Sequence, residues 1–134
     1  GWYRYPGGNG KVDDPIVADL AIEESHLAKR ERTDYSVEEI TERLVLAMIN
    51  EAADILDEGI AHNARDIDLV TVFGYGFPRW RGGLMHHADT LSAKAIVARL
   101  RELSQEDAVA WKVSPLLERC AERGINLADA APSK

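Results

Sequence analysis

The longest patterned stretch of the sequence runs from residue 36 to residue 59. Ser36 and Glu39 have the S-x-x-E spacing of a capping box, whose side chains bond the first backbone amides of a helix. Apolar residues then recur at steps of three and four, at Ile40, Leu44, Ala47, Met48, Ala52, Ile55 and Leu56. This spacing predicts one long helix that continues to about Glu58 and stops at Gly59.

Apolar residues also lie outside this stripe, at Val45, Leu46 and Ile49. A helix that is apolar on more than one side packs against more than one neighbour. We therefore expect the long helix to be the central element of the fold.

Capping signals predict shorter helices on both sides of the long one. Asp14 and Pro15 start a helix that reaches about Ala28, and a charged linker follows over residues 29–34. Asn63 caps the next helix. The later predicted helices span residues 64–73, 84–89, about 92–103, and from Ser114 and Pro115 to Gly124.

No segment alternates between apolar and polar residues as a strand does. The prediction is an all-α fold, a single helical domain of about five to seven helices around the long central helix, over residues 13–134. Residues 1–12, rich in glycine and aromatic residues, are expected to form an extended arm. Without a βαβ unit, we expect no nucleotide-binding domain within this chain.

The most distinctive segment, residues 74–83, reads G-Y-G-F-P-R-W-R-G-G and joins two predicted helices. Gly74 is expected to end the first helix in a left-handed conformation. Gly76 and Pro78 then predict a tight corner, and Gly82 and Gly83 mark a place where backbone passes close to other backbone. These five residues are the predicted structural corner.

A glycine-rich segment can also bind phosphate. The dinucleotide fingerprint needs a strand before it and a third glycine, but an amphipathic helix precedes this segment and Arg79 takes the third position. No Gly-Lys-Ser or Gly-Lys-Thr follows, so the P-loop pattern is missing as well. A structural corner is therefore the favoured interpretation.

Composition limits the classes of partner. The 134 residues are 46% hydrophobic, enough for one domain core, and carry a net charge of -7. This charge argues against nucleic acid and against an anionic membrane surface as main partners. No apolar run reaches the roughly 18 residues of a membrane span, and the single Cys120 allows no internal disulfide.

The candidate chemical groups are few. His86, His87 and Asp89 could suggest a metal, but adjacent helical residues point about 100 degrees apart, so both histidines cannot face one ion. Cys120 lies near Leu116 and Leu117 on a predicted helix, which favours a core residue over a nucleophile. The residues themselves indicate no catalytic, cofactor-binding or metal site.

Two long motifs carry a family resemblance. The segments E-R-L-V-L-A-M-I-N-E-A-A-D-I-L-D-E-G-I-A and D-I-D-L-V-T-V-F-G-Y-G-F-P-R-W-R-G-G resemble the C-terminal helical domain of the 3-hydroxyacyl-CoA dehydrogenase family. This resemblance implies a fold like the C-terminal domain of 6-phosphogluconate dehydrogenase. The opening G-W-Y-R-Y and the closing S-P-L-L-E-R-C-A-E-R-G resemble the last domain of multifunctional β-oxidation enzymes. Those enzymes carry enoyl-CoA hydratase and dehydrogenase activities, and this chain resembles the second of their two helical copies.

The resemblance also implies where catalysis takes place. In this family a His and Glu pair on a separate nucleotide-binding domain works with NAD, and the first helical copy adds an Asn before an Arg. The matching residues here are Glu42 and Arg43. The resemblance therefore implies a non-catalytic repeat without a cofactor of its own, cut from a parent enzyme that uses NAD.

The implied partners are the tandem helical domain and the nucleotide-binding domain of the same parent chain. The second copy would dock on the first as a pseudo-dimer, and the isolated chain is expected to form a homodimer through Trp80 and Met48. Two alternatives stay open: a stand-alone helical interaction module, and an acyl-CoA-binding module in which Arg79 and Arg81 receive phosphates.

The ends of the sequence add two expectations. The chain begins with Gly1 instead of Met, which suggests a piece of a longer polypeptide. A bacterial-type cytoplasmic location is expected and a peroxisomal one stays open, although the final Pro-Ser-Lys lacks the leucine of a peroxisomal address.

Overall fold

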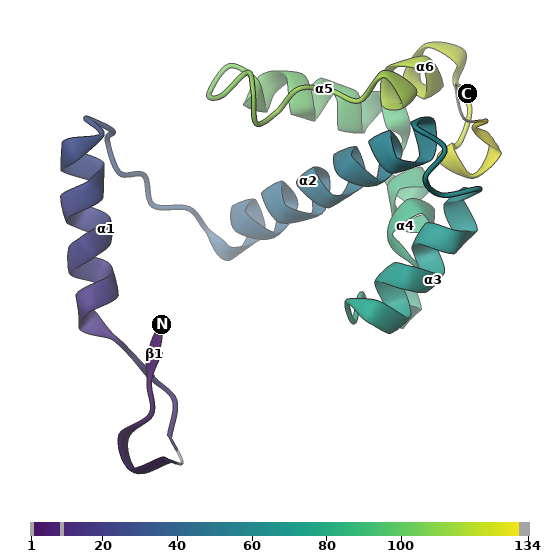
Figure 1. The fold of residues 1–134 in the computed structure, drawn as a ribbon. Coiled ribbons are helices and arrows are strands. Elements are labelled where there is room, and N and C mark those ends of the chain that lie inside the picture. Colours follow the sequence, from purple (N-terminus) through teal and green to yellow (C-terminus); the bar gives the residue numbers. More distant parts are fainter. Residues whose placement is uncertain (1, 9, 132–134) are drawn as a thin grey trace. The chain divides into compact units, whose positions relative to one another are not determined.

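The computed structural model describes residues 2–8 and 10–131. Gly1 and the final Pro-Ser-Lys, on which two expectations above rest, lie outside the described residues. The backbone forms two compact units, Gly1–Ser36 and Val37–Lys134. Figure 1 shows both, with the first unit in purple and dark blue.

The first unit contains a short hairpin and one helix. Strands β1 (Tyr3–Arg4) and β2 (Val12–Asp13) pair antiparallel, with a 3-10 turn η1 (Pro6–Gly8) between them. The expectation that no strand occurs was therefore wrong for the arm. Strands of two residues are too short to show alternation, and their pairing depends on a turn in which Gly7 has φ 73 and Gly8 has φ 82.

Helix α1 (Pro15–Leu27) begins as predicted. The Asp14 side chain accepts a hydrogen bond from the Ile16 amide at 3.1 Å. Asp14 also pairs with Arg4 at 2.8 Å, and this contact lowers the pKa of the Asp14 carboxyl. The hairpin and the helix are thereby tied together.

The second unit contains the other helices. They are α2 (Val37–Asp57), α3 (Ala64–Gly74), α4 (Leu84–Leu91), α5 (Ala93–Leu103) and α6 (Pro115–Arg123), with 3-10 turns η2 (Arg79–Arg81) and η3 (Leu127–Asp129). In Figure 1, α2 runs between α5 and α6 on one side and α3 and α4 on the other. With six α-helices among the described residues, the all-α fold around a long central helix is confirmed.

The core lies against the inner face of α2. Its buried α2 residues are Leu46, Ile49, Ala52, Ala53 and Leu56. Much of the stripe predicted from the sequence is instead exposed: Ile40 is 46% exposed, Leu44 62% and Met48 36%. The prediction of two apolar faces was right, but the division between them was not: Ala52 and Leu56 of the predicted stripe are buried together with Leu46 and Ile49 of the second face, whereas the first half of the stripe is exposed. Spacing along one helix cannot reveal which face its neighbours cover.

Polar side chains fix the segments around the core. The Asn50 amide donates to the Lys112 carbonyl and accepts from the Ser114 amide, both at 2.9 Å, which pins the start of α6 to α2. The Asp89 carboxylate accepts from the Leu127 amide at 2.7 Å, which holds η3 against α4. Cys120 is buried as predicted, and burial raises the pKa of its thiol.

The glycine corner differs from its prediction in two details. Gly74 is the last residue of α3 and has no positive φ; the left-handed residue is Gly76, with φ 73. Helix α3 ends because the Phe77 amide turns back to the Thr71 carbonyl at 3.0 Å. At Gly82 and Gly83 the close neighbours are side chains instead of backbone.

Gly82 and Gly83 have φ values of 79 and 118. A Cβ on Gly82 would collide with the His86 ring, and a Cβ on Gly83 would collide with the Asp68 carboxylate. Both the backbone conformation and the space therefore require glycine.

We expect Gly82→Ala and Gly83→Ala each to lower the free energy of unfolding by about 1–3 kcal/mol, because each adds backbone strain and a clash. Gly74→Ala is the matched control. Its Cβ would find only Val70 Cγ1, at 3.9 Å, so helix propensity predicts a change of no more than about 1 kcal/mol toward greater stability. Urea unfolding of the three variants is the measurement. Equal midpoints for all three would contradict this account of the corner.

Candidate functional site

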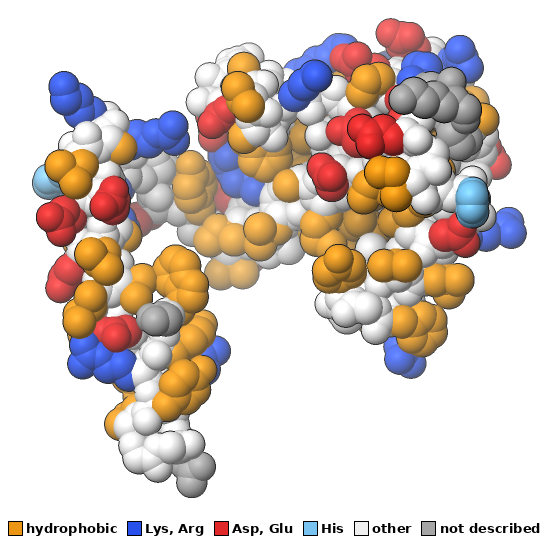
Figure 2. Space-filling model, viewed as in Figure 1, with side chains coloured by type: hydrophobic (Ala, Val, Ile, Leu, Met, Phe, Trp, Pro, Cys, Tyr) orange, Lys and Arg blue, Asp and Glu red, His pale blue; other side chains and the backbone are white. Residues whose placement is uncertain are grey.

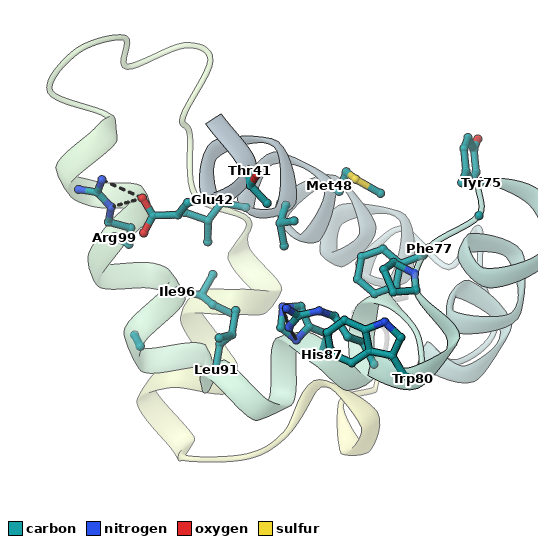
Figure 3. Close-up of a pocket in the computed structure, with 16 residues that line it drawn as sticks. Thr41, Glu42, Met48, Tyr75, Phe77, Trp80, His87, Leu91, Ile96 and Arg99 are labelled. Atoms are coloured by element: carbon teal, nitrogen blue, oxygen red, sulfur yellow. Dashed lines mark hydrogen bonds and ion pairs between the residues drawn. The ribbon is translucent and has the colours of Figure 1, made fainter. Parts of the chain in front are cut away.

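An apolar groove of about 780 Å³ lies between α2, the glycine corner, α4 and α5. Its walls include Val45 and Met48 from α2, Phe77 from the corner and Ile96 from α5. Figure 3 shows these elements around the groove, which has a polar end at Glu42 and Arg99 and an aromatic end at Phe77, Trp80 and His87. This volume lies within the range of small-molecule pockets.

The aromatic end combines one buried and one exposed ring. Phe77 is 9% exposed and packs near the His87 ring, with centroids 6.1 Å apart. Trp80 is 78% exposed, and the Arg81 guanidinium lies over its ring at 4.4 Å. The corner therefore presents a large apolar ring and a cation at the edge of the groove.

The polar end is closed by ion pairs. Arg99 on α5 donates to Glu42 on α2 at 2.9 Å and to Glu102 at 2.8 Å. The neighbouring Arg43 forms two hydrogen bonds of 2.8 Å with Glu106 and lowers the pKa of that carboxyl. Glu42 and Arg43 therefore join α2 to α5 and to the segment after it.

Asp68 holds the start of α4. Its carboxylate accepts hydrogen bonds from the Met85 amide at 2.7 Å and from the His86 amide at 3.2 Å. Burial raises the pKa of this carboxyl, although the two hydrogen bonds act in the opposite direction. Because α4 carries His87 into the groove, Asp68 also positions the aromatic end.

His87 faces a cation. Nη1 of Arg81 lies 3.3 Å from the ring nitrogens of His87. Burial and then the charges of Arg81 and His86 lower the pKa of His87, so its ring is neutral at pH 7. His86 and His87 do not converge, and no cluster in the described part of the chain could hold a metal ion.

The structure brings together only some of the residues singled out from the sequence. Met48 and Trp80, the predicted interface residues, line one groove with Gly76 and Pro78. Gly82 and Gly83 support the corner from outside the groove. Ile96 and Arg99 were not singled out from the sequence as site residues, because their place in the groove depends on how α5 crosses α2.

Apolar surface continues beyond the groove. We call Val37, Ile40, Leu44 and Met48 the outer stripe of α2; their exposed fractions lie between 36% and 73%. Leu69, Val70 and Phe73 are exposed on α3. Figure 2 shows hydrophobic side chains gathered along this lower edge of the second unit. Contiguous apolar surface of this kind is typical of an interaction site.

None of the helices in the described residues has the length and apolar character needed to cross a membrane.

These features define an all-α domain built on one central helix. The glycine corner borders its groove, and an apolar face adjoins the groove. The family model described as "3-hydroxyacyl-CoA dehydrogenase, C-terminal domain" matches residues 40–128, and the chain belongs to this family. The resemblance read from the two long motifs is thus confirmed.

Relatives of the chain are multifunctional enzymes. It is 33% identical over 138 residues to "Peroxisomal fatty acid beta-oxidation multifunctional protein AIM1" of Arabidopsis thaliana, covering 100% of this chain and 19% of that protein. It is 36% identical over 133 residues to "Peroxisomal bifunctional enzyme" of Danio rerio, covering 92% and 18%. It is 33% identical over 121 residues to "Fatty acid oxidation complex subunit alpha" of Shewanella sp. (strain MR-7), covering 90% and 17%.

The chain thus spans less than a fifth of the length of these relatives. They include both peroxisomal and bacterial proteins, the two settings that the sequence had left open.

Stability should fall as the pH is lowered from 7 to about 5.5, partly because of His87. Its folded pKa lies below its ordinary value of 6.5, so protons bind the unfolded chain more tightly and favour unfolding. Asp68, whose pKa burial raises, acts in the opposite sense. We expect His87→Gln to flatten the pH dependence of the urea midpoint in this range.

His62→Gln, on the exposed loop before α3, is the control and should keep the parent's slope. If His87→Gln and the parent show the same slope, the environment assigned to His87 is wrong.

Proposed function

We propose that this chain is the non-catalytic second helical repeat of a multifunctional fatty-acid β-oxidation enzyme. Its family and its coverage of less than a fifth of multifunctional relatives support this assignment. The proposal that the repeat is non-catalytic rests on one observation: Glu42 and Arg43 both form ion pairs within the domain. The ion pairs of these residues connect α2 to α5 and to the segment after it, and a carboxylate stands where the family's pattern has the carboxamide of the catalytic Asn.

The parent's activity would then come from its other parts. A separate nucleotide-binding domain of the parent would bind NAD and supply the His and Glu pair, and the first helical repeat would supply the Asn. This chain would contribute structure to that enzyme, without a cofactor or a metal of its own.

The structural contribution we propose is docking on the first helical repeat as a pseudo-dimer partner. The outer stripe of α2, the exposed residues of α3 and Trp80 give this unit an apolar face of the kind that a stable interface buries. Two similar domains can cover such faces mutually, because a twofold contact uses the same surface on each. The net charge of -7 favours a protein partner of this kind over nucleic acid or an anionic membrane surface.

An acyl-CoA site in the groove is the second candidate. The groove volume and the Arg81 guanidinium support it. However, Arg79 does not line the groove; it lies over Phe73, with 5.2 Å between its guanidinium carbon and the ring centroid. A ligand in the groove would also leave the rest of the apolar face uncovered.

A stand-alone interaction module is the third candidate. A nucleotide-binding fingerprint upstream of residue 1 in the parent gene would decide against it.

The isolated chain should neither bind NAD nor oxidise 3-hydroxyacyl-CoA. Calorimetric titration with NAD and a spectrophotometric turnover assay are the measurements. Glu42→Asn, which restores the family's pattern, should stay inactive as well, because the His and Glu pair belongs to another domain. NAD binding or turnover above a no-enzyme blank would contradict the non-catalytic assignment.

The isolated chain should self-associate at micromolar concentration, because its apolar face has lost the first repeat. Trp80→Ala should raise the dimer dissociation constant about tenfold or more, since exposed tryptophans are frequent hot spots of interfaces. Sedimentation equilibrium is the measurement, and urea unfolding at a concentration below dimerisation should show little change for this exposed side chain.

Trp2→Ala is a matched control, because Trp2 is 74% exposed and lies on the arm. It should leave the dissociation constant unchanged. A soluble monomer at all concentrations would remove the pseudo-dimer proposal, and a dimer weakened by Trp2→Ala but not by Trp80→Ala would place the interface elsewhere.

A further inference from the structure

The first unit contributes no residue to the hydrophobic core. No residue of α1 is buried, and every core residue in the described part of the chain lies between Leu46 and Leu127. Strands β1 and β2 have two residues each, and α1 has 13. A hairpin or a helix of this size is marginal on its own in water. The hairpin and α1 therefore need a partner surface to stabilise them.

The small side chains of α1 face the hairpin. Val17, Ala18 and Ala21 border a shallow hollow that Trp2 and Tyr3 also line. This side of the helix already has a neighbour within the first unit. A further partner would meet a different side of α1.

The large aliphatic side chains of α1 lie on such a side. We call Ile16, Leu20 and Leu27 the α1 stripe; they are 53%, 51% and 70% exposed. Their spacing places them within about 40 degrees of one another around the helix, and about 130 degrees from the side that faces the hairpin. Exposed apolar residues that share one side of a helix are the anchors by which helices dock in apolar grooves.

Acidic side chains accompany the α1 stripe. The helix contains Asp19, Glu23 and Glu24 but no Lys or Arg. Glu23 and Glu24 follow Leu20 by three and four residues, so they lie between Leu20 and Leu27 along the helix. All three acids are exposed, and none forms an ion pair within residues 2–8 and 10–131. A surface that receives this helix must therefore offer apolar contact and positive charge together.

The first unit lies outside the matched repeat. The family model matches residues 40–128, whereas the first unit ends at Ser36. The similarity to the Arabidopsis relative nevertheless covers 100% of this chain, so it includes the first unit, and it covers only 19% of that protein. In a parent of similar length, most of the surface that could receive α1 belongs to other parts of the enzyme.

We propose that α1 docks on a part of the parent enzyme outside these 134 residues. There the α1 stripe occupies an apolar groove, and Lys or Arg side chains at the rim of that groove pair with Glu23 and Glu24. The proposal rests on the proposed function in that it requires a longer parent. It adds a second docking surface, separate from the outer stripe of α2, whose partner stabilises the first unit.

Hydroxyl-radical footprinting of the parent and of the isolated chain, the latter below its dimerisation concentration, tests the docking. Oxidation of Leu20 and Leu27 should be about fivefold or more slower in the parent, because the core of an interface excludes water. Ile22 is the internal control. It is 45% exposed and lies about 140 degrees from the α1 stripe, so its rate should change less than about twofold.

Two results would overturn the docking. Equal rates for Leu20 and Leu27 in both samples would mean that no part of the parent outside this chain covers the α1 stripe. Slower oxidation of Ile22 in place of Leu20 would mean that the partner meets another side of α1.

A charge reversal tests the basic rim. Glu23→Lys in the parent should speed the oxidation of Leu20 about threefold or more, because it places like charges at the contact. Glu31→Lys makes the same change on the exposed linker and should leave the rate unchanged. Circular dichroism confirms that both variants are folded. An unchanged rate in Glu23→Lys would overturn the basic rim.

The same samples separate this inference from the pseudo-dimer proposal. Met48 and Trp80 report on the face assigned to the first repeat. If their oxidation slows in the parent while that of the α1 stripe does not, the docking of α1 is overturned and the pseudo-dimer is supported. The reverse result supports the docking of α1 and contradicts the pseudo-dimer.

Discussion

The structure depends on how α2 divides its apolar residues between two faces. Leu46, Ile49, Ala53 and Leu56 are buried on the inner face, where α2 packs against α4 and α6. The outer stripe remains exposed. Burying an apolar side chain contributes about 1.5–3 kcal/mol, so the inner face supplies much of the driving force for this unit. The second apolar face on the same helix takes no part in this core, and it is the surface on which the proposed docking rests.

The polar contacts around α2 follow from the same division. Asn50 lies at the margin of the inner face and fixes the segment that leads into α6, while Glu42 and Arg43 reach α5 and the segment beyond it. The contacts of Glu42 and Arg43 join the first half of α2 to α5 and to the segment after it, at the polar end of the groove. Asp68 then fixes the start of α4 and closes the aromatic end. The groove is therefore a consequence of the core packing.

Local signals in the sequence were enough to predict most helix boundaries. The structure confirms the helix caps at Asp14 and Asn63 and the helix stop at Gly124. All three act through backbone hydrogen bonds of neighbouring residues. The errors lie where distant contacts decide. Gly74 was taken as the left-handed residue, yet Gly76 is, because the bond from Phe77 to Thr71 sets the end of α3. Helix crossings decide which face of α2 is buried. They also bring Ile96 and Arg99 to the groove, and no local pattern encodes them.

The proposed function would give the ion pairs of Glu42 and Arg43 and the second face of α2 one explanation. In a repeat that performs no chemistry, residues at the position of the family's catalytic pair would be free to serve stability, and Glu42 and Arg43 join α2 to α5 and to the segment after it. The proposed pairing surface would be under a different constraint. It would have to present an apolar face of the right shape, or the partner repeat would be left with exposed apolar surface of its own. On this proposal, the ion pairs at the polar end and the apolar face that includes Trp80 and Met48 are two results of one division of labour between repeats.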